Sequence, residues 1–284
     1  MPVLHEKLAA ARAQLVAAGS STAEATIDVD LYARTILGWD RSRLLTELRS
    51  PAPDALEPTF SDWLARREQR EPTAYILGVR EFWGLDFAVS GSVLIPRPES
   101  ELIVDEAIGL LRDVRFPRVA DVGTGSGCLA VSIAYEVPAA RVVATDISAD
   151  ALVVARTNAE RHGLLDRVTF AHTSHLDGVS GPFDVIVANV PYVKDGDRPA
   201  LSRQVAGYEP HVALFGGADG LRDITAVLDA ATDKLAPGGW FIFEFGLGQD
   251  DRILELVARY PKLQLERLRR DLQDIPRTAV VRRL

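Results

Sequence analysis

Hydrophobic residues follow two different patterns along the chain, and the change falls near residue 78. Before it, apolar side chains recur at helical spacing, as in Leu4, Leu8 and Leu15, and no alternation typical of strands interrupts them. Glycines and prolines separate the apolar stretches, as expected at helix ends. We therefore predict a small all-helical domain over residues 1–78, with helices over residues 4–15, 41–48 and 60–70 and a further helix that is capped by Ser21 or Thr22 and ends before Gly38.

From residue 79 onward the pattern is typical of strands. Residues 79–95 hold short apolar runs broken by Gly84 and Gly91, which predicts a β-hairpin linker. Strands and helical stretches then alternate over residues 96–284, which predicts a doubly wound α/β domain with a parallel sheet covered on both faces. The predicted strands are 119–122, 141–145, 168–171, 184–188, 240–245, 263–265 and 278–281, the last two around a loop containing Pro276, and the predicted helices include 100–111, 149–161 and 223–235.

Composition and charge narrow the classes of function. Among 284 residues, 40 are acidic and 32 basic, and the formal charge of −8 opposes a nucleic-acid partner held mainly through its phosphates. The single cysteine excludes a disulfide framework. No apolar run approaches the length of a membrane helix, and the first residues do not resemble a signal peptide. We therefore expect a cytoplasmic enzyme, monomeric, with no membrane or nucleic-acid partner.

A glycine-rich loop follows the first strand of the predicted sheet. Gly123, Gly125 and Gly127 allow the backbone to turn tightly and to approach a ligand closely. The third glycine comes one residue too early for a dinucleotide fingerprint, which needs Gly or Ala where this chain has Cys128. Asp146 ends the next strand, where an acid can accept both hydroxyls of an adenosine ribose. The pattern predicts a nucleoside site and favours S-adenosylmethionine over a dinucleotide.

A short polar turn, Asn189-Val190-Pro191-Tyr192, follows the strand at residues 184–188 and therefore faces the ligand crevice of an α/β sheet. The side-chain carbonyl of Asn189 and the backbone carbonyl of Val190 can accept both hydrogens of a planar NH2 group. Tyr192 can stack on the flat group that carries this nitrogen. Taken alone, the motif is better explained as an ordinary polar strand-end turn, because short loop motifs recur by chance.

Longer blocks of the sequence resemble the HemK/PrmC family of methyltransferases. They are collinear and span nearly the whole chain: Arg70-Glu71-Pro72-x-x-Tyr75-Ile76-x-Gly78, Glu81-Phe82-x-Gly84, residues 94–101, residues 208–221, and Pro237-Gly238-Gly239 before Glu244. The resemblance implies a Rossmann-like class I fold with a mostly parallel seven-stranded sheet. It also implies transfer of a methyl group from S-adenosyl-L-methionine to the glutamine side-chain nitrogen in the Gly-Gly-Gln motif of class-1 peptide chain release factors, which the helical domain helps to bind.

The resemblance further implies roles for individual residues. The cofactor-binding residues are expected to be Arg97, Gly123, Thr124, Gly125, Gly127, Asp146, Ser174 and Asn189, and the catalytic residues Asn189, Val190, Pro191 and Tyr192. An amide nitrogen is a poor nucleophile, so polarisation of its N–H bonds and alignment with the methyl donor are the expected catalytic devices. The sequence indicates no general base and no metal site.

Three departures from the family pattern keep alternatives open. Val190 replaces the first proline of Asn-Pro-Pro-Tyr, residues 171–175 lack the acidic–aromatic pair that meets the adenine, and residues 271–274 lack the closing Asp-Gly. A paralogue that N-methylates a small-molecule amide or amine is the main alternative. The net charge opposes a DNA adenine methyltransferase, and the intact glycines oppose a non-enzymatic adaptor. His172 and His175 are expected to be loop histidines rather than metal ligands.

Overall fold

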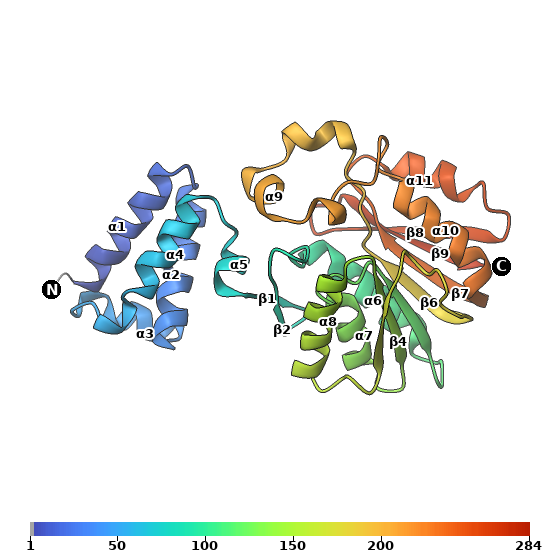
Figure 1. Ribbon diagram of the computed structural model, residues 1–284, viewed down its shortest axis with the longest axis horizontal. Coiled ribbons are helices and arrows are strands. Elements are labelled where there is room, and N and C mark those ends of the chain that lie inside the picture. The colour runs from blue at the N-terminus through green and yellow to red at the C-terminus, as the bar shows by residue number, and fades with distance from the viewer. Residues whose placement is uncertain (1–2) are drawn as a thin grey trace. The chain divides into compact units, whose positions relative to one another are not determined.

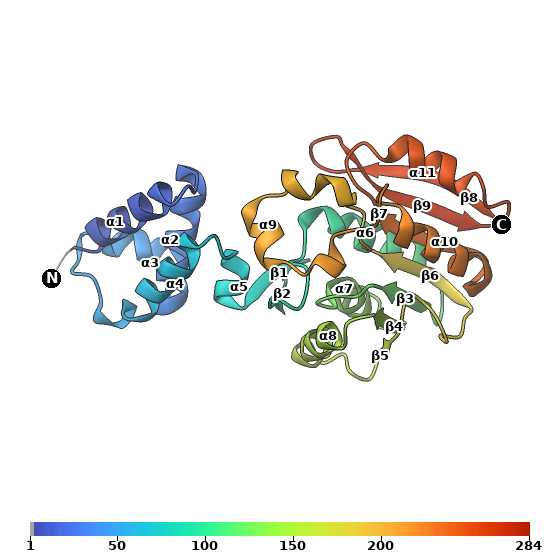
Figure 2. The same ribbon diagram turned by 45° about the horizontal axis from the view of Figure 1, so that its top comes forward.

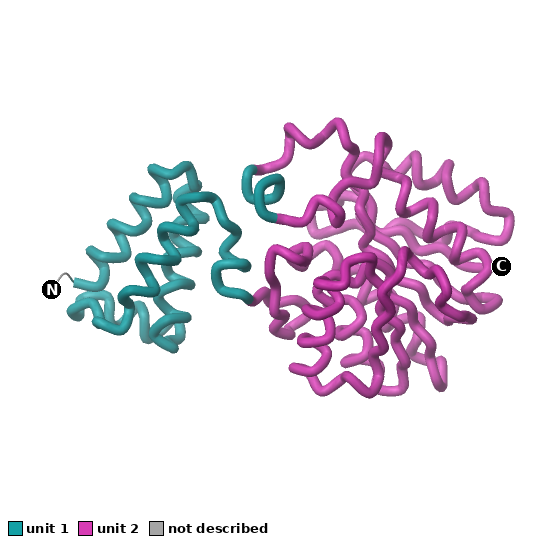
Figure 3. The backbone as a smooth tube through the Cα atoms, in the orientation of Figure 1, with its two compact units in different colours: residues 1–78, 203–208 teal, residues 79–202, 209–284 magenta. Residues whose placement is uncertain are grey.

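The computed structural model describes residues 3–284, which divide into two compact units (Figure 3). The first unit runs to Gly78 and includes the short helix α9 (Arg203–Tyr208). The second comprises residues 79–202 and 209–284. Each unit has a hydrophobic core of its own, one in the first and two in the second.

The first unit is helical, as the sequence predicts. Its longer helices are α1 (Leu4–Ala17), α2 (Thr22–Leu37), α3 (Arg41–Thr46), α4 (Thr59–Glu68) and α5 (Thr73–Leu77), with short 3-10 turns at Glu47–Arg49 and Asp54–Leu56. Ser21 and Glu24 form a capping box that starts α2, and Gly38 ends it in the left-handed conformation. The sequence analysis missed α5, because a five-residue helix between Pro72 and Gly78 leaves no periodic signal.

A buried ion pair ties the helices of this unit together. Arg67 of α4 donates from Nε to Asp28 Oδ2 of α2 at 2.7 Å, and Thr73 of α5 donates to Asp28 Oδ1 at 2.7 Å. Both charged side chains are almost fully buried, so removal of either one would leave the charge of the other buried without a partner. Tyr208 of α9 donates to the Gln69 carbonyl at 2.8 Å, which attaches α9 to the same unit.

The second unit begins with the predicted β-hairpin. Strands β1 (Val79–Phe82) and β2 (Leu85–Ala88) pair in antiparallel fashion around Trp83 and Gly84, which both have positive φ. The side chain of Asn158 exchanges two hydrogen bonds with the Ala88 backbone, at 2.7 and 3.0 Å, and donates a third to the Ser126 carbonyl at 2.8 Å. Asn158 therefore connects the hairpin with the glycine loop.

The main sheet has seven strands in the order β5-β4-β3-β6-β7-β9-β8, and all pairs are parallel except those that β9 makes. Its strands are β3 (Arg118–Val122), β4 (Arg141–Asp146), β5 (Val168–His172), β6 (Phe183–Ala188), β7 (Leu235–Glu244), β8 (Leu263–Arg270) and β9 (Pro276–Arg283). The doubly wound, mostly parallel fold is thus confirmed.

Helices cover both faces of the sheet (Figure 1; Figure 2). On one face lie α6 (Glu101–Leu111), α7 (Cys128–Glu136) and α8 (Ala149–Arg161), and on the other α10 (Arg222–Lys234) and α11 (Asp250–Val257). Consecutive residues of β6 point to opposite faces of the sheet. Val185 packs in the core on the side of α6, α7 and α8, and Ile186 packs in the core on the side of α10 and α11. No helix in residues 3–284 is long and apolar enough to span a bilayer.

Some element limits differ from the sequence prediction. Strand β7 begins at Leu235 rather than 240, because the Pro-Gly-Gly segment that usually breaks a strand is accommodated by a shift in register beside Phe183. Pro276 was expected in a loop and instead opens β9, where it pairs with Arg270. Helix α6 begins at Glu101 rather than at the predicted residue 100, because Ser100 belongs to the preceding 3-10 turn, Pro98–Ser100.

Candidate active site

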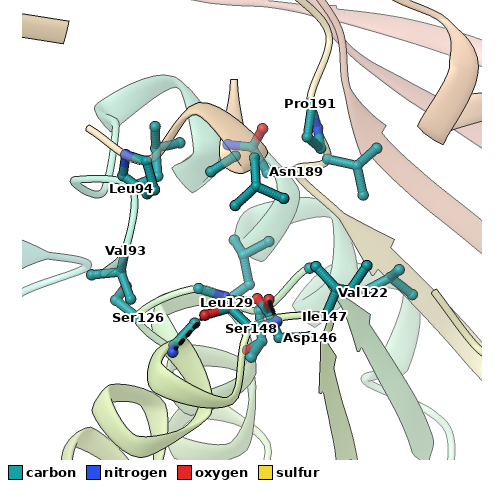
Figure 4. Close-up of a pocket in the computed structure, with 18 of the residues that line it drawn as sticks. Val93, Leu94, Val122, Ser126, Leu129, Asp146, Ile147, Ser148, Asn189 and Pro191 are labelled. Carbon is teal, nitrogen blue, oxygen red and sulfur yellow. Dashed lines mark hydrogen bonds between the residues drawn. The ribbon is translucent and has the colours of Figure 1, made fainter. Parts of the chain in front are cut away.

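A cavity of about 430 Å³ lies where the parallel strands end (Figure 4). Its wall includes Val122 and the loop after β3, Asp146 at the end of β4, Ser174 after β5 and Asn189 after β6. Because the carboxyl ends of parallel strands share one edge of the sheet, residues far apart in sequence meet here. Figure 4 shows Val93 and Leu94 on the opposite side of the cavity from Asn189 and Pro191.

The three glycines of the loop after β3 have different surroundings. Gly123 and Gly125 line the cavity with positive φ, and a Cβ on Gly125 would meet no atom within 4 Å, so it would project into open space. Gly127 does not line the cavity: a Cβ there would lie 3.1 Å from the Ala155 Cβ. Gly127 therefore permits close packing of α7 against α8.

A buried carboxylate anchors this loop from behind. Asp121 Oδ2 accepts hydrogen bonds from the Thr124 hydroxyl at 2.6 Å and from the Ala130 N–H at 3.1 Å. Burial raises the pKa of Asp121 to about 7, although both hydrogen bonds favour the charged form. Thr124 also lines the cavity, and its hydroxyl belongs to the internal support of the loop.

Asp146 presents a carboxylate that is held at two points. Its Oδ2 accepts the Gly125 N–H at 2.9 Å, and its Oδ1 accepts the Ser148 N–H at 2.9 Å. Each oxygen keeps a further acceptor position, so the pair fits two neighbouring hydroxyls. Ile147 follows it into the cavity wall and is 59% exposed, an apolar surface for a flat ring that the sequence analysis did not identify.

Asn189 is held by a network centred on Glu244 at the end of β7. The Asn189 Nδ2 donates to Ser100 Oγ at 2.8 Å and to Glu244 Oε2 at 3.2 Å, while the Ser100 hydroxyl donates to the same Oε2 at 2.5 Å. Tyr192 donates from its hydroxyl to Glu244 Oε1 at 2.8 Å. Burial raises the pKa of Glu244, against the opposing effect of these hydrogen bonds.

The structure brings three of the four turn residues to the cavity. Asn189, Val190 and Pro191 line it, whereas Tyr192 lies outside its wall with its hydroxyl turned to Glu244. The Val190 side chain is only 3% exposed and packs in the core, and Gly123 lies directly beside it. Among the described residues, neither Asn189 Oδ1 nor the Val190 carbonyl has a hydrogen-bond donor.

Two glycines support the back of this turn. A Cβ on Gly216 would lie 2.3 Å from the Pro191 carbonyl oxygen, and a Cβ on Gly220 would lie 2.2 Å from the Tyr192 carbonyl oxygen. Gln249 donates to the same Tyr192 carbonyl at 3.1 Å. The block 208–221, whose function the sequence did not reveal, is thus the support on which the turn rests.

The remaining candidates, Arg97 and Ser174, also line the cavity. Arg97 pairs with the buried Glu209 at 2.6 Å. The Ser174 hydroxyl is 3.0 Å from His175 Nδ1, and His175 Nε2 is 3.2 Å from Asp223 Oδ1. Despite burial, hydrogen bonds from His175 and Arg222 lower the pKa of Asp223. His172 stands outside the wall and contacts the Ile147 carbonyl.

Solved structures of methyltransferases share this fold. The catalytic domain of hMettl16, in complex with MAT2A 3′UTR hairpin 6, matches with a TM-score of 0.57 at 17% identity, over 78% of this chain and 82% of that one. The ribosomal protein L11 methylase from Lactobacillus delbrueckii subsp. bulgaricus matches with a TM-score of 0.50 at 24% identity, over 66% of this chain and 80% of that one. The second unit therefore has the class I methyltransferase fold.

Sequence relatives define the family more closely. Residues 6–78 match the family model of the PrmC N-terminal domain, and residues 103–206 match that of the methyltransferase small domain. The release factor glutamine methyltransferase of Bradyrhizobium diazoefficiens is 37% identical over 100% of this chain and 97% of its own length. That of Geobacter sulfurreducens is 42% identical over 83% of this chain and 82% of its own. The chain belongs to the family of release factor glutamine methyltransferases.

The cofactor of this enzyme is S-adenosyl-L-methionine. The cavity fits it in two respects: the open space over Gly125 leaves room for a ligand against the backbone, and Asp146 keeps acceptor positions suited to ribose hydroxyls. The carboxylates that hold these groups in place, Asp121, Glu209 and Glu244, were not predicted from the sequence. No local motif marks them, because each acts on residues distant in sequence or from behind the cavity wall.

Proposed function

We propose that this enzyme transfers the methyl group of S-adenosylmethionine to the side-chain nitrogen of the glutamine in the Gly-Gly-Gln motif of class-1 release factors. The observation that carries the proposal is the pair of unpartnered acceptors, Asn189 Oδ1 and the Val190 carbonyl, beside the cofactor loop. Two acceptors suit the two hydrogens of a primary amide. Similarity to release factor glutamine methyltransferases over the whole chain supports this choice of acceptor.

The catalytic residues would act by holding and polarising the acceptor amide. Asn189 Oδ1 and the Val190 carbonyl accept its two N–H bonds, which increases electron density on nitrogen and directs its lone pair toward the cofactor. When bound, S-adenosylmethionine would supply a methyl group attached to a positively charged sulfur, and this sulfur would keep the electron pair of the broken S–C bond and become a neutral thioether. The nitrogen forms the new N–C bond and loses one proton to water. Pro191 keeps the Val190 carbonyl extended, and Tyr192 steadies the turn through Glu244.

The cofactor residues divide into those that touch it and those that shape its site. Asp146 would bind the ribose hydroxyls, Ile147 would offer an apolar surface to the adenine, and Ser174 with the His175–Asp223 pair would offer it polar groups in place of the acidic–aromatic pair. Gly123, Thr124 and Gly125 would hold the cofactor through the loop, and Arg97 would close over it. Gly127 acts indirectly, by setting the distance between α7 and α8.

The helical unit would help to recognise the release factor. Residues 1–78 form the proposed recognition domain, residues 79–95 the linker and residues 96–284 the catalytic domain. The match of residues 6–78 to the PrmC N-terminal model supports this division.

We further propose that the enzyme works in the cytoplasm as a monomer, without nucleic-acid or membrane partners. Val190 does not favour a small-molecule acceptor, because its side chain packs in the core and its carbonyl is kept.

Radiolabelled S-adenosylmethionine tests the proposal directly. We would incubate the protein with a purified class-1 release factor and, in parallel, with a variant factor whose loop glutamine is replaced by alanine. Label on the wild-type factor alone is the expected result. Equal label on both factors, or no label although calorimetry shows cofactor binding, would overturn the proposed acceptor.

A further inference from the structure

Glu244 is a buried carboxylate that contacts the Asn189–Tyr192 turn without reaching the cavity. Its side chain is 2% exposed, lies behind the cavity wall and is absent from the cavity lining. Both oxygens are used as acceptors: Oε1 by Tyr192, and Oε2 by Ser100 and Asn189. Burial of a carboxylate costs free energy unless its hydrogen bonds offset the loss of water, so this placement calls for a function.

The network distinguishes the two orientations of the Asn189 amide. As it stands, the NH2 group faces two acceptors, the carboxylate of Glu244 and the oxygen of Ser100, whose own hydrogen is directed to Glu244. After a half-turn of the amide, Asn189 Oδ1 would face these acceptors, and the NH2 group would point into the cavity. Two oxygen acceptors that face each other in a buried site repel, so the Asn189 amide is stable only with its NH2 group toward Glu244 and Ser100.

We propose that Glu244 is a positioning residue that, together with Ser100, fixes Asn189 with Oδ1 toward the acceptor nitrogen. The inference rests on the proposed function, because it explains how the site selects a donor NH2. The fixed Oδ1 accepts from an amide such as glutamine and repels a carboxylate such as glutamate, which offers only acceptors. The selectivity for an amide is thus set by a residue that does not contact the substrate.

Replacement of Glu244 tests the proposal by the split between kcat and the cofactor dissociation constant. Glu244→Ala frees the Asn189 amide to rotate, and we expect kcat on the release factor to fall about 100-fold, as for other losses of alignment. The dissociation constant for S-adenosylmethionine should change less than about threefold, since Glu244 lies outside the cavity wall. Glu244→Gln keeps an amide oxygen for Ser100 and Asn189 and can donate to Tyr192, so it should retain at least a tenth of the wild-type kcat.

An exchange of groups between the two residues gives a sharper test. Asn189→Asp places a carboxylate against Glu244 and should be nearly inactive. In the double variant Asn189→Asp with Glu244→Gln, the new amide at position 244 can donate to the new carboxylate at position 189, whose other oxygen again faces the acceptor. We expect the double variant to be at least tenfold more active than Asn189→Asp, a non-additive result that a merely structural role would not produce.

A second buried carboxylate provides the matched control. Glu106 of α6 is 6% exposed and bonds to Arg267 and Arg269 of β8, away from the cavity. Glu106→Gln should lower Tm and leave kcat unchanged.

Two outcomes would overturn the positioning role of Glu244. One is that the losses of kcat in Asn189→Asp and Glu244→Gln simply add in the double variant. The other is that Glu244→Gln is as inactive as Glu244→Ala, which would indicate that Glu244 acts as a proton acceptor. Failure of the proposed function is separate, because the wild-type enzyme would then not label the release factor at all.

Discussion

Asp146 and Asn189 both stand at strand ends in one cavity, but their hydrogen bonds assign them to different partners. Asp146 is fixed by two backbone N–H groups of the glycine loop and the α8 start. Asn189 is fixed by side chains, Ser100 and Glu244, and keeps its carbonyl oxygen free. This difference supports the proposal that Asp146 binds the cofactor and Asn189 binds the acceptor amide.

This division predicts opposite effects of two alanine substitutions. Asn189→Ala should lower kcat at least 100-fold and leave the S-adenosylmethionine dissociation constant within about threefold of wild type, because it removes an acceptor for the substrate amide. Asp146→Ala should instead weaken cofactor binding at least tenfold, since two ribose hydrogen bonds are lost. Calorimetry and steady-state kinetics measure both. Equal loss of binding in the two variants would contradict the assignment.

Cys128 provides a pH-dependent readout of the same cavity. Burial raises the pKa of its thiol to about 12, and only the thiolate reacts with alkylating reagents. At pH 8 the thiolate fraction is about one part in ten thousand, so labelling of the native protein should be slow and should rise about tenfold per pH unit up to pH 10. Because Cys128 lines the cavity, S-adenosylmethionine should slow it further. Fast labelling at pH 7 by mass spectrometry would refute the raised pKa.

At the scale of elements, regular patterns were predictable and long-range supports were not. Helix α8 and the four strands β3 to β6 arise from local periodicity and cap signals, and the sequence predicted their limits to within one residue at each end, whereas β8 was predicted over residues 263–265 and extends to Arg270. Helix α5 and the early start of β7 went unpredicted, because tertiary packing rather than local preference decides them. Glu244 lies 55 residues from Asn189 and Ser100 lies 89 residues away, so no spacing rule relates them.

The turn after β6 packs against a second loop, which contains Gly216 and Gly220. Addition of a single methyl group at Gly216 tests whether the turn needs this contact. Gly216 has an ordinary φ, so Gly216→Ala is opposed by close contacts rather than by backbone strain: the new Cβ would lie 2.3 Å from the Pro191 carbonyl oxygen and 3.0 Å from that of Gly220. Backbone must move, and kcat should fall at least tenfold because the acceptors on the turn are displaced. Gly196→Ala is the control, since a Cβ there meets nothing within 4 Å. Equal kinetics of the two variants would show that the turn does not rest on Gly216.

At the scale of the whole molecule, the chain consists of two units whose cores are separate. The core of the first unit is formed by α1, α2, α4 and their neighbours, and those of the second by the sheet and its covering helices. All residues of the cavity wall belong to the second unit. Binding of cofactor and chemistry can therefore be separated from recognition of a protein acceptor.

Removal of residues 1–78 tests this separation. The remaining chain keeps both cores of the sheet and every lining residue, so the S-adenosylmethionine dissociation constant should stay within about threefold of that of the full chain. The helical unit would contribute contacts only to an acceptor large enough to reach it, so kcat/KM should fall at least tenfold for an intact release factor and little for a short peptide that carries Gly-Gly-Gln. Arg203–Tyr208 loses its partners in this variant, and Tyr208→Phe in the full chain separates that effect, because it removes only the hydrogen bond to Gln69. An equal fall for factor and peptide would mean that the helical unit supports the catalytic domain rather than recognises the acceptor.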